Sequence, residues 1–245
     1  MSEIRSDDPV AVALIQAIRT GDLSALNELL AANPELASAH LVGNRGSRTP
    51  LHVATDWPGY FSNGPAVVRV LLDAGADPNG SPLGMPHSET PLHWAASSDD
   101  VDVAEALIDG GADIEAPGGS IAGTPLANAV GYGCWHVARL LVTRGARVET
   151  LWQAAALGLL ARVDELLTGD PRPTREEINN AFWQACHGGQ RRTAERLLAH
   201  GADINWIPDY ADGTPLDIAG ALDTRKENIV TWLGEMGAGS SKHAG

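Results

Sequence analysis

The strongest constraint on the fold is a pair of short motifs that alternate along the chain at nearly constant spacing. The tripeptide Thr-Pro-Leu begins at Thr49, Thr90, Thr124 and Thr214, and a Gly-Ala pair closes the segment that follows, at Gly75, Gly111, Gly145 and Gly237. Thr90 and Gly111 are 21 residues apart, as are Thr124 and Gly145. Such periodicity is typical of stacked units that cannot bury their apolar faces alone. The sequence therefore predicts a repeat solenoid.

The residues of one unit predict a pair of helices. In Thr-Pro-Leu-His-Trp-Ala-Ala at 90–96, Thr90 is a suitable N-cap and Pro91 suits the first helical position, where no N–H is needed. Segment 101–108 carries apolar residues at helical spacing and predicts the second helix. Gly111 then suits the left-handed residue that ends a helix.

Thr-Pro-Leu-His-x-Ala, followed by Leu-Leu-x-x-Gly-Ala-Asp, resembles the ankyrin repeat. The resemblance covers nearly the whole chain, at 47–79, 88–115, 123–149 and 178–205, with degenerate units at 9–38 and 150–170 and a terminal cap at 212–238. It implies an all-α solenoid of about seven helix pairs with short β-hairpin loops and a concave groove. We expect a single ankyrin-repeat domain over 1–238, followed by a disordered tail over 239–245.

The charge and the apolar pattern exclude several classes of partner. The net charge is −14, whereas nucleic acids are bound through Lys and Arg, so we expect no nucleic-acid partner. No apolar run approaches the roughly 20 residues of a membrane span, and the N-terminus lacks the pattern of a signal peptide. Cys134 and Cys186 have no metal-type spacing, and Cys186, in the place of the second Ala of a packed helix pair, predicts a buried reduced thiol. We therefore expect a cytoplasmic monomer without cofactor or metal.

Two insertions interrupt the regular spacing. Thr49 and Gly75 are 26 residues apart, five more than in the next unit, and the excess falls in 57–64. Gly75 and Thr90 are 15 residues apart where a 33-residue repeat would leave 12, so this loop gains three residues, within Ser-Pro-Leu-Gly-Met-Pro-His at 81–87. Loops on a rigid scaffold often carry binding groups. In the first hairpin loop, Arg45 and Arg48 are either solvated or a clamp for a carboxylate or phosphate.

Tryptophan usage points to a recognition surface, since seven of the twelve aromatic residues are Trp. Trp94, Trp135 and Trp232 are interpreted as packing between units, and His52 and His93 as braces of the first helical turn. Trp152 and Trp183 stand at the place of the motif histidine, and Tyr132 and His187 follow the small pair at a position that the family turns toward the groove. Together with the two insertions and the last hairpin loop, this phase predicts a binding set of Arg45, Arg48, Trp57, Tyr60, His87, Tyr132, Trp152, Trp183, His187, Trp206, Asp209 and Tyr210.

Two functions agree with these features. The resemblance implies a binding protein that recognises a protein partner through an aromatic-rich groove, without catalysis. The alternative is a protein that binds a small aromatic or apolar ligand, or an enzyme of specialised metabolism. Its acid–base site would be formed by His87, His187 and Asp209. A contiguous patch favours the first function, and a pocket that encloses a ligand favours the second.

Overall fold

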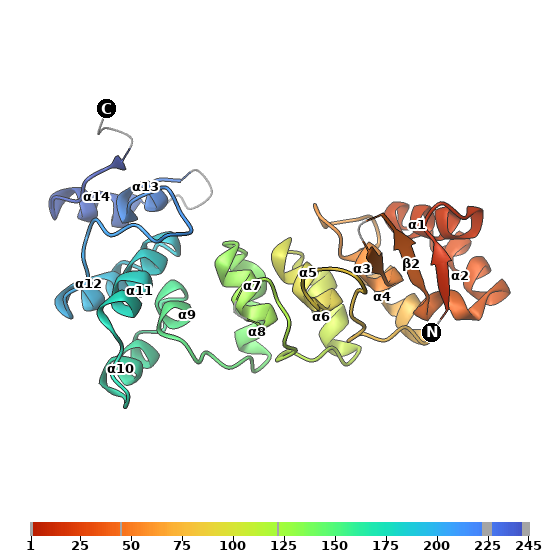
Figure 1. Ribbon diagram of the computed structural model, residues 1–245, viewed down its shortest axis with the longest axis horizontal. Helices are drawn as coiled ribbons and strands as arrows, with labels where there is room; N and C mark the ends of the chain where they lie inside the picture. Colours follow the sequence, from red (N-terminus) through yellow and green to blue (C-terminus); the bar gives the residue numbers. More distant parts are fainter. Residues whose placement is uncertain (1, 45, 122, 222–226, 242–245) are drawn as a thin grey trace. The chain divides into compact units, whose positions relative to one another are not determined.

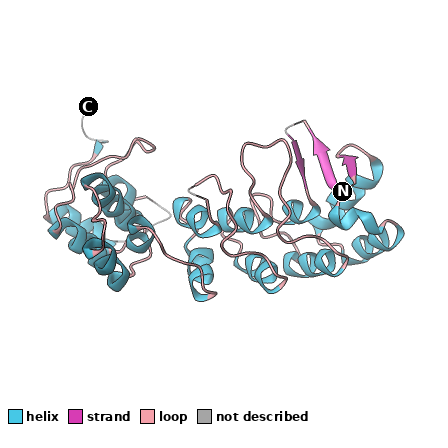
Figure 2. Cartoon of the chain, turned by 60° about the horizontal axis from the view of Figure 1, so that its bottom comes forward, coloured by secondary structure: helices cyan, strands magenta, loops and turns pink. Residues whose placement is uncertain are grey.

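The computed structural model describes residues 2–44, 46–121, 123–221 and 227–241, and its regular structure is mostly helical (Figure 1, Figure 2). The described residues form fourteen α-helices in seven consecutive pairs, which confirms the predicted fold class. The first four pairs are α1 Pro9–Thr20, α2 Leu23–Ala32, α3 Pro50–Ala54, α4 Gly64–Asp73, α5 Pro91–Ser97, α6 Val101–Asp109, α7 Pro125–Gly131 and α8 Trp135–Thr143. The remaining pairs are α9 Leu151–Ala156, α10 Leu160–Thr168, α11 Arg175–His187, α12 Arg191–Ala199, α13 Pro215–Ala219 and α14 Glu227–Glu235.

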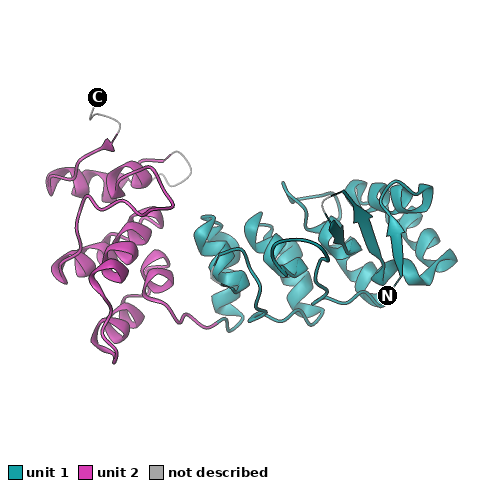
Figure 3. Cartoon of the chain, viewed as in Figure 1, with its two compact units in different colours: residues 1–146 teal, residues 147–245 magenta. Residues whose placement is uncertain are grey.

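The chain divides into two compact units, residues 1–146 and 147–245 (Figure 3). Each unit has two layers, because every helix pair packs on the next pair along the chain. In the first unit α1, α3, α5 and α7 form one row, and α2, α4, α6 and α8 form the other. In the second unit the rows are α9, α11, α13 and α10, α12, α14. A single repeat domain over 1–238 stays a prediction.

Three short strands lie at the N-terminal end of the first unit. Strand β2 His40–Gly43 pairs antiparallel with β3 Gly46–Arg48, which is the expected kind of hairpin loop. Strand β1 Glu3–Arg5 pairs in parallel with β2 and places Ile4 beside the buried Leu41. A 3-10 turn, Pro34–Ser38, connects α2 to this sheet. The sequence analysis did not predict β1, since three residues with two charges give no strand pattern.

The repeated motifs begin and end the helices as predicted. Thr49 and Thr214 have extended backbones, and their hydroxyl oxygens accept hydrogen bonds from the backbone N–H of His52 and Asp217 in the first turn. These bonds satisfy donors that would otherwise lack a partner at a helix start. Gly111 has φ +90°, a left-handed conformation that only glycine adopts without strain, and it terminates the segment after α6.

The second unit has a continuous core between its helix rows. Phe182 and Cys186 of α11 are fully buried there, and Trp232 of α14 packs 6.5 Å from Phe182 between ring centroids. The interpretation of Trp232 as a packing residue is confirmed. Cys186 is a buried free thiol, as expected, Cys134 is buried and free as well, and burial raises the pKa of each.

The segment after Ala238 is attached to the last helix pair. The N–H of Gly239 donates to Asn205 Oδ1 at 2.7 Å, and the hydroxyls of Ser240 and Ser241 donate to the Asp217 carboxylate at 2.6 and 2.7 Å. The part of the expected disordered tail that the structure describes, 239–241, is therefore hydrogen bonded to the second unit. Residues 242–245 lie outside the described residues.

Candidate partner-binding site

The motif histidines of the first unit connect each helix start to the next loop. Nδ1 of His52 accepts from the N–H of Thr49 at 3.3 Å, and its Nε2 donates to the carbonyl oxygen of Glu89 at 2.8 Å. His93 repeats the pattern, with Nε2 3.1 Å from the carbonyl oxygen of Gly123. Burial lowers the pKa of His52 to about 4 and also lowers that of His93, so both rings are neutral at pH 7. The predicted bracing role is confirmed.

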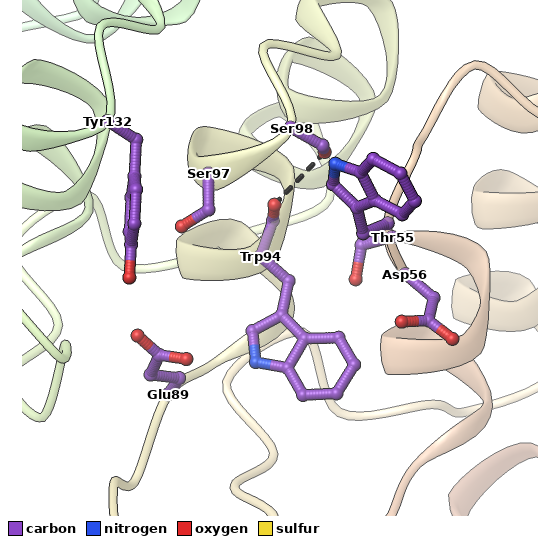
Figure 4. A pocket seen from close by; sticks show the side chains of 8 residues that line it. Thr55, Asp56, Glu89, Trp94, Ser97, Ser98 and Tyr132 are labelled. Atoms are coloured by element: carbon purple, nitrogen blue, oxygen red, sulfur yellow. Dashed lines mark hydrogen bonds between the residues drawn. The ribbon is translucent and has the colours of Figure 1, made fainter.

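A pocket of about 210 Å³ opens beside these braces. Tyr132, Trp94 and Glu89 reach it from the end of α7, from α5 and from the loop before α5 (Figure 4). Trp94 also packs edge-on against His52 at 4.9 Å between ring centroids, so its predicted packing between units is confirmed and it lines the pocket as well. The full lining is Thr55, Asp56, Trp57, Glu89, Trp94, Ser97, Ser98 and Tyr132.

Several residues that line the pocket stand at equivalent positions of successive repeats. Trp57, Ser98 and Tyr132 each stand eight residues after the threonine that caps their helix, at Thr49, Thr90 and Thr124. The sequence analysis selected Trp57 and Tyr132 for this phase, and the structure brings the two together. It missed Thr55, Asp56, Ser97 and Ser98 as lining residues, although their count from the capping threonine could have found them.

The inserted loop at 57–63 is hydrogen bonded to its neighbours at its middle, Tyr60, and at its last residue, Asn63. The backbone N–H of Tyr60 donates to Asp100 Oδ2 at 2.6 Å, and the Tyr60 hydroxyl donates to the carbonyl oxygen of Asp99 at 2.5 Å. Asn63 reaches the preceding helix pair, where its side-chain amide donates to the carbonyl oxygen of Gly21 at 2.9 Å. These bonds fix the backbone of the loop that carries Trp57, which is 79% exposed and lines the pocket.

Glu89 is the half-buried carboxylate of this pocket. Burial would raise its pKa, but hydrogen bonds from the N–H of Ser120 at 2.9 Å and the amide of Asn128 at 2.7 Å outweigh it and lower the pKa. Both donors bind the same oxygen, Oε1. A carboxylate that accepts such bonds is ionised at pH 7.

Arg48 is committed to an ion pair beside the pocket. Its guanidinium lies 2.7 Å from Asp56 Oδ2, and Arg19 contacts the same oxygen at 2.8 Å. Arg48 is thus paired with a carboxylate of the chain itself, and its role as a solvated side chain or an anion clamp stays a prediction. Arg45 lies outside the described residues. His87 is exposed on the loop between α4 and α5 and is not among the residues that line the pocket.

In the second unit, the predicted aromatic residues form a packed cluster. Trp183 is 5% exposed and its Nε1 donates to the carbonyl oxygen of Gly213 at 2.9 Å, as the motif histidines do in their units. His187, 8% exposed, lies 5.5 Å from the Trp183 ring and 3.3 Å from Gln184 Oε1. The expected groove position of His187 is corrected to a buried one. His187 is the last residue of α11, and its ring packs beside Trp183 rather than turning outward.

Tyr210 covers the edge of this cluster. Its ring stands edge-on to Trp183 at 5.9 Å, and its hydroxyl donates to Asn180 Oδ1 at 2.5 Å and accepts from the Gln184 amide at 3.2 Å. Asp209, beside Tyr210, is exposed, and Trp206 is half-buried in the same loop. Tyr210 therefore joins Trp183 and His187 in one site, and its exposed ring edge is the accessible part.

Trp152 occupies a different register from the one expected. The third helical residue after the cap Thr150 is Gln153, whose Oε1 accepts from the Thr150 hydroxyl at 2.9 Å, so Gln153 takes the place of the motif histidine. Trp152 is half-buried against the core of the second unit and lines a hollow of about 350 Å³ with Pro171 and Glu177.

Comparisons with known proteins agree with this architecture. The family model described as ankyrin repeats (3 copies) matches residues 62–150. The ankyrin repeat and KH domain-containing protein CBG24701 of Caenorhabditis briggsae is 30% identical over 155 residues, which are 59% of this chain and 6% of that protein. The crystal structure of the ankyrin repeat domain of Bcl-3, a member of the IkappaB protein family, is similar with a TM-score of 0.52 and 25% identity. The match covers 94% of this chain and all of that one.

The stacked helix pairs and their capped motifs define a repeat protein of the solenoid class. The chain contains ankyrin repeats, as its motifs predicted. Ankyrin repeats typically serve as protein interaction modules. No helix in the described part of the chain is long and apolar enough to cross a membrane. Nor do the described residues include a cluster of three or more His, Cys, Asp or Glu that could hold a metal ion.

Proposed function

We propose that this chain binds a protein partner through the pocket face of its first unit. The observation that carries the proposal is Trp57, which is 79% exposed on a loop that is hydrogen bonded to the repeat before it, at Gly21, and to the repeat after it, at Asp100. Tryptophan is enriched among residues that dominate binding energy, and a group held in place before binding loses less entropy. An exposed apolar ring costs solubility in a free protein, so its fixed display supports a recognition role.

The surface around Trp57 continues beyond the pocket into a second hollow. A second hollow of about 450 Å³ adjoins the pocket and shares Asp56 and Trp94 with it. The second hollow extends to Arg48 of the β2–β3 hairpin and to Met85 in the insertion at 81–87. The two hollows therefore form one surface across the ends of α3 and α5.

The pocket at Trp57, taken without the adjoining hollow, is smaller than the usual site of a drug-sized ligand. Sites for drug-sized ligands usually measure about 300–1,000 Å³ and enclose most of the ligand. The pocket at Trp57 measures about 210 Å³, which suits one side chain of a partner. The acid–base alternative has less support, because His187 is buried and hydrogen bonded to Gln184. We also propose that the protein works as a monomer in the cytoplasm, where its two free cysteines would stay reduced.

Site-specific photo-crosslinking tests this proposal. A benzophenone amino acid would replace Trp57 or Tyr132 at the pocket, and Arg69 or Asp102 on the other helix row as matched controls, in cells that naturally make the protein. We expect one protein to be captured from positions 57 and 132 and not from 69 and 102. Equal capture from all four positions would contradict the proposal, as would native mass spectra in which a small molecule occupies the purified protein.

A further inference from the structure

We propose that the pocket lined by Trp57, Trp94, Tyr132 and Glu89 takes a basic side chain, lysine or arginine, from the protein partner. This inference rests on the proposed function and adds to it the chemistry of the contact. Three features carry it, which are the aromatic faces, the carboxylate of Glu89 and the hydrogen-bonding character of the lining.

The aromatic rings supply the first feature. Trp57 and Tyr132 are 79% and 54% exposed, and Trp94 is half-buried between them and His52. The face of an aromatic ring carries partial negative charge, and it attracts ammonium and guanidinium groups within about 6 Å, most strongly for tryptophan. The rings therefore favour a cation or an apolar group over an anion.

Glu89 supplies the second feature and separates a cation from an apolar group. Its carboxylate is ionised, half-buried and oriented through Oε1 by two neutral donors, Ser120 and Asn128. No Arg or Lys side chain within the described residues forms an ion pair with it. An ionised group in a partly desolvated pocket is stabilised further when an opposite charge reaches it.

The hydroxyl groups of the lining supply the third feature, because their protons are already used. Thr55, Ser97 and Ser98 donate to the backbone carbonyl oxygens of Leu51, His93 and Trp94 at 3.1, 2.9 and 3.1 Å (Figure 4 for Ser98). The Ser98 oxygen keeps lone pairs that accept hydrogen bonds, as does the Ser97 oxygen beside its 3.3 Å bond from the Asn128 amide, whereas Thr55 is fully buried. Lysine and arginine side chains donate and cannot accept, so they match such a lining.

Asp56 does not add to the attraction for a cation. Its Oδ2 is paired with both Arg19 and Arg48, so this group carries one net positive charge at the border with the second hollow, and Glu89 supplies the unpaired negative charge of the pocket lining. The pocket itself is lined by two carboxylates and by no cationic side chain. The net charge of −14 over the whole chain also attracts a basic partner at long range.

Peptide titration followed by NMR tests the inference. The probes are acetylated and amidated Gly-Gly-X-Gly-Gly peptides with X as lysine, arginine, norleucine or glutamate, added at constant ionic strength. The indole N–H signals of Trp57 and Trp94 are assigned from single Trp→Phe variants. We expect the lysine or arginine peptide to shift both signals, and the norleucine and glutamate peptides to shift neither.

Two variants and a matched control complete the experiment. Glu89→Gln keeps the size and an acceptor for Ser120, and it should weaken the basic peptide roughly tenfold. Trp57→Ala removes an exposed ring and should weaken it similarly, whereas Asp73→Asn, which removes one exposed charge on α4, should leave it unchanged. The variants are compared only where their NMR spectra show the native fold.

The outcomes separate this inference from the proposed function. Equal shifts with norleucine and lysine, or an unchanged affinity in Glu89→Gln, would overturn cation recognition. If a protein is still captured at positions 57 and 132 in that case, the proposed function stands and the partner is anchored by another side chain. If no protein is captured there and no peptide binds, both fall.

Discussion

The carbonyl oxygen of Glu89 accepts a hydrogen bond from Nε2 of His52 at 2.8 Å, while the carboxylate of the same Glu89 lines the pocket. The ring of His52 also contacts Trp94, with 4.9 Å between centroids. One motif histidine therefore positions two of the groups that form the candidate binding site. The brace that stabilises the repeat is also a positioning element for recognition.

Two substitutions of His52 should separate the contributions of its two hydrogen bonds to the free energy of unfolding. In His52→Gln the side chain can keep the bond to Thr49, as Gln153 does with Thr150 in its own unit, but it loses the contact with Glu89. In His52→Ala both bonds are lost and a cavity forms. We expect His52→Ala to lower the free energy of unfolding by about 2–3 kcal/mol and His52→Gln by about 1 kcal/mol, measured by urea denaturation at pH 7. Equal losses would mean that the bond to Glu89 and the ring contact with Trp94, which both variants lose, account for the whole effect.

The stability of the first unit should depend on pH through the same ring. The pKa of His52 falls from 6.5 in the unfolded chain to about 4 in the folded one because the ring is buried, and the pKa of His93 is lowered too. The folded state therefore disfavours the proton, so stability is full above pH 6.5 and is lost as the pH falls toward 4. Urea midpoints measured between pH 7 and 4.5 should decline, and less steeply in His52→Gln. An identical slope in that variant would assign the decline to other groups.

The helix pairs could be predicted from the sequence because local chemistry determines them. Thr49 caps a helix through its own hydroxyl, and Gly111 ends a segment through its own backbone freedom, so neither needs a distant partner to be recognised. The same holds for His52, whose role follows from its position in a repeated motif.

The candidate site was only partly predictable, since it depends on which residues the stack brings together. Trp57 and Tyr132 were selected by their phase in the repeat, but Glu89 enters the pocket from a loop whose path depends on bonds to Asn128 and Ser120 of the following unit. His187 was misplaced for a related reason. Its spacing resembles that of a groove residue, yet Trp183 and Gln184 pack around it.

Tryptophan fluorescence should distinguish the rings of the two units. Trp57 is 79% exposed and Trp183 is 5% exposed. Trp57→Phe should therefore reduce the fraction of emission that acrylamide quenches, whereas Trp183→Phe should remove emission that acrylamide does not reach. A large drop in the quenchable fraction for Trp183→Phe would show that the cluster around Trp183 opens in solution.

Removal of the His187 ring should destabilise the second unit. The side chain is 8% exposed, contacts Trp183 and lies within hydrogen-bonding distance of Gln184. His187→Ala should lower the free energy of unfolding by roughly 1–3 kcal/mol, similar to His93→Ala, because a buried partner and its packing are lost. His200→Ala, at an exposed position after α12, is the control and should stay within about 0.5 kcal/mol of the parent protein. Unchanged stability in His187→Ala would restore the original expectation of a groove residue.

Tyr60 offers a test of whether the fixed loop matters to binding. Its hydroxyl donates to the carbonyl oxygen of Asp99 and its N–H donates to Asp100, so the ring ties the insertion to the next helix pair without lining the pocket. Tyr60→Phe removes only the hydroxyl and should cost about 1 kcal/mol or less in global stability, because the group is near the surface and water can replace its bond. The loop would then sample more positions, so the entropy cost of ordering Trp57 would be incurred on binding.

We therefore expect Tyr60→Phe to weaken capture of the partner at position 132 and to broaden the indole signal of Trp57, while the signal of Trp94 stays sharp. Full capture together with an unchanged Trp57 signal would show that the remaining bonds of Tyr60 and Asn63 suffice to fix the loop.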